Sequence, residues 1–156
     1  MIGGDGGHRT KVSVIGAVSV SPRTRRLGLY FDTRADGFFG ASEVVEFLRY
    51  LLRSLVGKVI VVWDGGTNHK GPIVRSFLAR NPRLWLERLP PYAPELNPVE
   101  QVWSWLKYGQ LANFVPADVS ELDDEVIDRL IHLRCDPKLL RALWDGSKLP
   151  FPEEHS

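Results

Sequence analysis

The sequence predicts a mixed α/β domain in which helices flank a sheet with both antiparallel and parallel strands. Near the N-terminus, two runs rich in β-branched residues are joined by a short turn, which is typical of an antiparallel hairpin. Farther along, short apolar runs alternate with segments whose apolar residues recur every three or four positions, which is typical of strands alternating with helices. The predicted order is β-β-α-β-α-β-α-α in one domain.

The composition is that of a folded globular protein. Of 156 residues, 44% are hydrophobic and 25% are charged, a balance that excludes a disordered chain. Lys and Arg total 20 against 19 Asp and Glu, so any contact with nucleic acid must come from a local basic patch. The single cysteine, Cys135, excludes a disulfide within the chain and a Cys-based zinc site. No apolar run approaches the roughly 20 residues of a membrane helix, and we expect a soluble cytoplasmic protein without a membrane partner.

The first third of the chain is predicted to hold the hairpin and one helix. Glycines predict a flexible start over residues 1–10, and the hairpin strands are expected over 12–20 and 27–31. Their turn is basic, and it is either solvated or a contact for phosphate groups; its arginines are Arg23, Arg25 and Arg26. From Ser42 to Leu55 the apolar residues follow a helical period, and Gly57 is placed to end that helix.

Two strands and a helix are predicted next. The unbroken apolar run 58–63 predicts a strand buried on both faces, with a parallel neighbour and a central position. A helix is expected over 72–79 and a strand over 84–88. The segment 89–98 contains four prolines, which exclude regular structure there.

The C-terminal third is predicted to be helical. Asn97, Pro98 and Glu100 suit the N-cap, first and third positions of a helix that ends near Leu111. Another helix is expected over 120–134, with Ser120 and Asp123 as its cap signal, and a shorter one over 137–144. Residues 149–156 are expected to form a frayed tail, so that the folded domain covers 11–148.

Two carboxylates stand at the ends of predicted elements. Asp64 follows the strand 58–63, at the strand end where open α/β sheets usually bind ligands; a plain Asp-Gly turn explains it equally well. Glu100 stands at the third position of a helix, where a capping interaction is the simpler explanation. Between them lie 35 residues.

The sequence around these carboxylates resembles a known family. The segment LPPYAPELNPVEQVW, residues 89–103, is similar to the stretch LPPYSPxLNPIExxWxxLK of DDE-superfamily catalytic domains in bacterial insertion-sequence transposases of the mariner-related group. The segment VVWDGGTNHK, residues 61–70, is similar to the family's vxDNxxxHk strand end. The resemblance implies an RNase H-like fold and metal-dependent cleavage and strand transfer of DNA. It implies Asp64 and Glu100 as the second and third acidic ligands of Mg²⁺ or Mn²⁺, which prefer carboxylate oxygen.

The resemblance also implies neighbours of this site. His69 recurs in the family pattern, and a surface histidine is its alternative explanation. Asn97 begins the helix of Glu100, and Lys107 lies seven residues after Glu100, on the same face of an α-helix. A solvated lysine is the alternative for Lys107. Lys70, like the arginines of the hairpin turn, is a candidate phosphate contact.

The chain departs from the family pattern at its first acid. That acid belongs on a strand before Val12, where Asp5 is the sole acidic residue, and the glycines around Asp5 argue against a central strand. Asp32 and Asp36 match no family ligand, and Gly65 replaces a frequent Asn. We therefore expect a sheet without its first strand, and no counterpart of the family's N-terminal helix-turn-helix.

Three functions follow as alternatives. The first is a catalytic fragment of a transposase that acts on the element ends and on target DNA, in the bacterial cytoplasm and at the nucleoid. Its expected partner is a separate N-terminal frame product of the transposase or a second copy of the chain. The second is an inactive remnant or a regulatory subunit that associates with a complete transposase. A nucleotide or phosphosugar enzyme is the third, and the lack of a phosphate-binding glycine motif after any strand argues against it.

Overall fold

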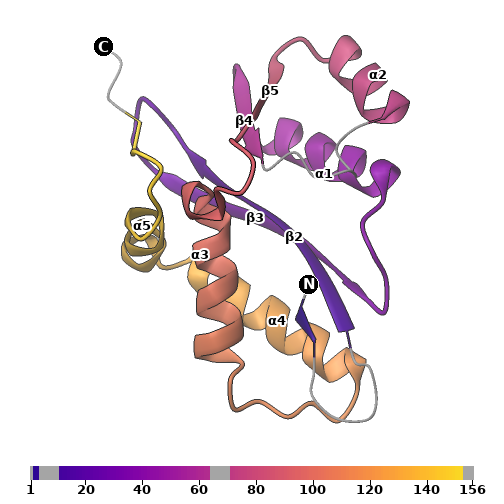
Figure 1. The fold of residues 1–156 in the computed structure, drawn as a ribbon, viewed down its shortest axis with the longest axis vertical. Helices are drawn as coiled ribbons and strands as arrows, with labels where there is room; N and C mark the ends of the chain where they lie inside the picture. Colours follow the sequence, from indigo (N-terminus) through magenta and orange to yellow (C-terminus); the bar gives the residue numbers. More distant parts are fainter. Residues whose placement is uncertain (1, 4–10, 64–70, 153–156) are drawn as a thin grey trace. The chain divides into compact units, whose positions relative to one another are not determined.

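The computed structural model describes residues 2–3, 11–63 and 71–152. The chain divides into two compact units, and the first is discontinuous in sequence (Figure 1). Unit 1 consists of Met1–Phe38 and Pro98–Ser156, and unit 2 consists of Phe39–Asn97. Glu100 therefore belongs to unit 1, whereas Asp64 belongs to unit 2.

Unit 1 contains an antiparallel sheet in the order β1-β2-β3. Its strands are β1 (Ile2–Gly3), β2 (Lys11–Val20) and β3 (Leu27–Ala35). The register runs from Val12 opposite Ala35 to Val20 opposite Leu27. The predicted hairpin is confirmed, and its second strand continues four residues beyond the predicted end.

One face of this hairpin builds the core of unit 1. Alternate residues of a strand point to the same face, and the register brings those of β2 opposite those of β3. The residues that face the core are Val12, Val14, Val18, Leu27, Leu29 and Phe31. Val12, toward the open end of the hairpin, and Leu29, nearer its turn, are at most 2% exposed, and the other residues of this face are partly buried.

The helices of unit 1 supply the rest of this core (Figure 1). They are α3 (Pro98–Ser104), the π-helix η3 (Trp105–Gln110), α4 (Val119–Arg134) and α5 (Pro137–Asp145). Their most deeply buried side chains are Val102, Leu106, Val126, Leu130, Leu133 and Leu140. Arg134 closes the end of α4 on the sheet, since its Nε donates to the Leu29 carbonyl at 3.2 Å and its guanidinium lies over Phe31.

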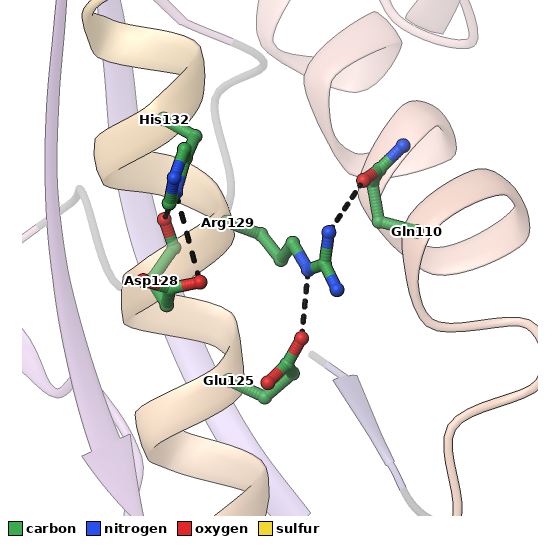
Figure 2. A network of polar contacts seen from close by, with 5 residues as sticks. All are labelled: Gln110, Glu125, Asp128, Arg129 and His132. Carbon is green, nitrogen blue, oxygen red and sulfur yellow. Dashed lines mark hydrogen bonds and ion pairs between the residues drawn. The ribbon is translucent and has the colours of Figure 1, made fainter.

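A polar network joins the π-helix to α4, as Figure 2 shows. Arg129 of α4 donates from Nε to Glu125 at 2.7 Å and from Nη1 to Gln110 at 3.3 Å. One turn farther along, Nδ1 of His132 lies 2.7 Å from the Asp128 carbonyl oxygen. The last residue of the π-helix is thus held by a charged side chain of α4.

The start of α4 differs from the sequence prediction. Ser120 and Asp123 were expected to supply the cap, but the N-cap residue is Asp118, whose carboxylate accepts from the Glu121 N–H at 2.8 Å. Asp118 has the extended backbone of an N-cap, so the helix begins at Val119 and already includes Ser120. The start of α5 at Pro137 is as predicted.

Unit 2 contains a parallel strand pair and two helices. Its elements are α1 (Ala41–Ser54), β4 (Val59–Trp63), α2 (Pro72–Arg80), β5 (Leu84–Arg88) and the 3₁₀ turn η2 (Pro94–Leu96). Strands β4 and β5 pair in parallel from Val59 opposite Leu84 to Trp63 opposite Arg88. The buried side chains of the helices are Val44, Val45, Phe47, Leu48, Leu51, Leu52, Val74 and Phe77. The predicted helices, strands and parallel neighbour are confirmed.

The burial of β4 does not follow the prediction. Val59 is buried, but Ile60 is 60% exposed and Val62 is 40% exposed, so the strand is not buried on both faces. Among the described residues β4 pairs with β5 alone, which does not give it the central position expected. The reason is that Ile60 and its partner Trp85 share a face that the rest of unit 2 leaves uncovered.

The mixed α/β class is confirmed, because antiparallel and parallel pairing both occur and both sheets are accompanied by helices. Across the described ranges, no helix is both long and apolar enough to cross a membrane.

Candidate active site

Glu100 is the third residue of α3, as the sequence predicts. The proline-rich segment before it forms the turn η2, in which the Leu96 N–H donates to Ala93 at 3.1 Å and the Asn97 N–H donates to Pro94 at 3.0 Å. This turn ends at Asn97, and the helix begins at once with Pro98. Glu100 is half-buried. The segment 89–98 therefore leads directly into α3, so the carboxylate of Glu100 lies in the first turn of a helix.

The helix of Glu100 is anchored to the sheet within one turn. Val102 and Leu106 are completely buried in the core of unit 1. Trp103 packs its indole ring on Gly16 in the middle of β2, so closely that a Cβ atom there would lie 2.7 Å from Cη2 of the ring. Because side chains three residues apart share a helix face, Trp103 fixes the part of α3 that carries Glu100.

Lys107 follows Glu100 by seven residues, but the two are not joined by a continuous α-helix. An interval of seven residues brings two side chains together on an α-helix, but residues 105–110 form a π-helix, closed by the Leu111 N–H donating to the Leu106 carbonyl at 2.9 Å. A π-helix has a wider turn than an α-helix, so the seven-residue interval does not by itself define a shared face, and Lys107 as a neighbour of Glu100 stays a prediction. Its ammonium lies 5.5 Å from the ring centre of Tyr108, and its side chain is exposed.

Asp64, His69 and Lys70 lie outside the described residues. The structure describes the residue before Asp64: the carbonyl of Trp63 accepts from the Leu89 N–H at 2.7 Å. Strand β4 is thus paired with β5 to its last residue. The proximity of Asp64 to Glu100 joins two separate units and stays a prediction.

Asp32 and Asp36, which the structure describes, are not arranged as metal ligands. Asp5 lies outside the described residues. Asp32 accepts from the Thr33 N–H at 2.9 Å, and Asp36 takes a left-handed backbone with φ 53° just after β3. Within residues 2–3, 11–63 and 71–152, no three acidic, His or Cys side chains gather where they could hold a metal ion. The predicted pair, Asp64 and Glu100, offers carboxylate oxygens, which fit a hard divalent cation.

The arginines of the hairpin turn lie in unit 1 and are exposed. Sequence reasoning missed the residue that contacts one of them: the ring of Phe151, in the predicted tail, lies 4.9 Å from the guanidinium carbon of Arg25. A single aromatic residue after a proline-containing segment gave no signal for this contact.

Comparisons with known proteins agree with the resemblance in the sequence. The family model described as DDE superfamily endonuclease matches residues 4–123. A comparison with curated proteins gives no match. Among solved structures, the Mos1 transposase catalytic domain with Raltegravir and Mn has a TM-score of 0.60 at 15% identity, over 86% of this chain and 74% of that one. A crystal structure of the catalytic domain of Mos1 mariner transposase has a TM-score of 0.53 at 17% identity, over 89% of this chain and 83% of that one.

The family match covers most of the chain, including Asp64 and Glu100. The two solved structures share the fold of this chain. The chain therefore belongs to the DDE superfamily endonuclease family and has the RNase H-like fold of a transposase catalytic domain.

Proposed function

We propose that the chain cleaves DNA and transfers the cut strand during transposition of an insertion element. The observation that carries this proposal is Glu100 at the start of α3, preceded by the family's proline-rich segment and held to the sheet through Trp103. Family membership supports a divalent cation as cofactor, and the Mn in one of the two Mos1 catalytic-domain structures is in keeping with it.

Asp64 and Glu100 would hold Mg²⁺ or Mn²⁺. Two such ions stabilise the attacking and the leaving oxygen of a phosphodiester when they are bound. The chain's own contribution is position: Glu100 stands on a helix whose next turn is buried, and Asp64 follows a strand paired to its last residue. Carboxylates on rigid elements keep their place better than carboxylates on loops. His69 and Asn97 are proposed as neighbours of this pair.

A third acid and the DNA complete the proposal. We propose that the first acid of the family pattern is supplied by a separate N-terminal product that associates with this chain. The substrates are the ends of the element and its target, and the place of action is the bacterial nucleoid.

The test is nicking of a supercoiled plasmid that carries the DNA flanking the gene, by the chain together with the N-terminal product that supplies the first acid, in the presence of Mg²⁺ or Mn²⁺. We expect Asp64→Asn and Glu100→Gln each to abolish nicking. Glu95→Gln, which removes an exposed carboxylate of the same segment, is the matched control and should nick as the unchanged chain does. Nicking that survives both active-site changes would overturn the proposal. Absence of nicking together with co-purification of a complete transposase would favour the regulatory alternative.

A further inference from the structure

The turn between β2 and β3 is an ordered structure that presents three arginines. The Ser21 N–H donates to the Arg26 carbonyl at 3.0 Å, and the Arg25 N–H donates back to the Ser21 carbonyl at 2.8 Å. Two further backbone N–H groups, those of Thr24 and Arg26, donate to side-chain hydroxyls within the turn at 3.3 Å. The three guanidinium groups therefore project from a closed turn.

Among the described residues, no acidic side chain balances the charge of these arginines. Arg23, Arg25 and Arg26 are all exposed. Three positive charges within four residues of one turn repel one another. Such an arrangement is stabilised when an anion binds.

Phe151 extends this basic turn toward α5. Its ring lies 4.9 Å from the guanidinium carbon of Arg25 and 3.7 Å from that of Arg141, and it packs edge-on against Trp144 with 5.6 Å between ring centres. Arg141 also pairs with Asp145 at 3.0 Å, so its own charge is balanced. Since a ring beneath a guanidinium leaves the N–H edge open, Phe151 holds Arg25 in place without covering its donors.

We infer that these residues form a docking surface for the phosphate backbone of duplex DNA, with Arg23, Arg25 and Arg26 as the contacts and Phe151 as the support of Arg25. We call this surface the basic tip. Arginine is the side chain best suited to phosphate, because its planar fork donates two parallel hydrogen bonds. The inference rests on the proposed function, since DNA is the substrate that function requires. It adds a surface in unit 1 that lies outside the proposed metal site.

The experiment is titration of the full chain into a fluorescent 30-base-pair duplex at several salt concentrations, in EDTA so that no cleavage occurs. Each lost phosphate contact lowers the slope of log Kd against log salt by about 0.9. We expect the triple variant Arg23→Gln, Arg25→Gln, Arg26→Gln to lower that slope by roughly 2 to 3. A variant with the same change in net charge on exposed positions of unit 2, Arg53→Gln, Lys58→Gln, Arg75→Gln, should leave the slope unchanged. Equal slopes for the unchanged chain and the basic-tip variant, or an equal loss in the control, would overturn the inference.

Phe151 provides a second, independent variant. Phe151→Leu removes the ring but keeps an apolar side chain, and it should lower the slope by up to about 1 because Arg25 loses its support. Phe151→Tyr keeps the ring and should bind as the unchanged chain does. Unchanged binding by Phe151→Leu would contradict the supporting role. Polyglutamate that displaces the duplex as well as unlabelled DNA does would overturn the assignment to DNA.

Binding and nicking separate the two proposals. If the basic-tip variant loses salt-dependent binding while the unchanged chain, supplied with the product that carries the first acid, fails to nick, the proposed function is wrong and the inferred DNA-docking surface is supported. If the unchanged chain nicks DNA and the basic-tip variant binds DNA normally, the inferred docking surface is wrong and the proposed function is supported.

Discussion

Gly16 of β2 and Trp103 of α3 fit together without space for a single additional carbon. A Cβ atom at Gly16 would lie 2.7 Å from Cη2 and 2.9 Å from Cζ2 of the indole ring. Glycine in the middle of a strand normally weakens the strand. At position 16 glycine is favoured because the Trp103 ring lies where a side chain would be. The contact ties the hairpin to the helix that begins with Glu100.

Gly16→Ala is therefore expected to destabilise the protein, although alanine is usually the better strand residue. Overpacking of this kind costs about 1–3 kcal/mol, which urea unfolding would measure. The double variant Gly16→Ala, Trp103→Leu should be more stable than an additive sum of the two single changes predicts. Additive effects would show that the ring and the glycine do not act on each other.

Asp118→Ala is expected to destabilise α4 by about 1 kcal/mol, because the carboxylate that accepts from the Glu121 N–H is lost. The matched control is Ser120→Ala, at the residue that the sequence pattern suggests as the cap. Thermal unfolding should separate the two variants, with Ser120→Ala close to the unchanged chain. A larger loss of stability in Ser120→Ala than in Asp118→Ala would show that Ser120 is the cap, as the sequence pattern predicts.

Arg83 supports the end of α1 in unit 2. Its guanidinium donates to the carbonyls of Leu55 at 2.9 Å and Gly57 at 3.0 Å, and to that of Leu52. Carbonyls at a helix end have no partner within the helix, so Arg83→Ala should cost about 1–3 kcal/mol.

The measurement for Arg83 is urea unfolding together with hydrogen exchange of the amides in the last turn of α1. Arg80→Ala is the control, since Arg80 is exposed and makes one longer bond, to the Ser76 carbonyl at 3.3 Å. Equal stability of the two variants would contradict the role given to Arg83.

Local patterns predicted the elements well, and contacts between distant residues were not predicted. The helix after Ser42 follows from the period of its apolar residues, because that period reports which side faces a core. The hairpin follows from two β-branched runs joined by a short turn. The same signal cannot tell how many faces are covered, which is why Ile60 was wrongly expected to be buried.

For the candidate site, too, the sequence predicted local positions but not contacts between distant residues. Glu100 at the third position of its helix follows from the residues that begin it, Asn97 and Pro98. The π-helix after Ser104 has no local signature, so the face of Lys107 could not be derived from a helical repeat. The contact of Phe151 with Arg25 joins residues far apart in the chain, and no sequence period encodes such a pair.

The central claim is that Asp64 and Glu100 bind the same divalent cation site, and Mn²⁺ binding followed by electron paramagnetic resonance tests it most directly. We expect Asp64→Asn and Glu100→Gln each to weaken Mn²⁺ binding strongly. The double variant should be little worse than either single one, because the effects of residues that share one site are not additive. Full Mn²⁺ affinity in either single variant, or additive losses in the double variant, would show that the two carboxylates act at separate places.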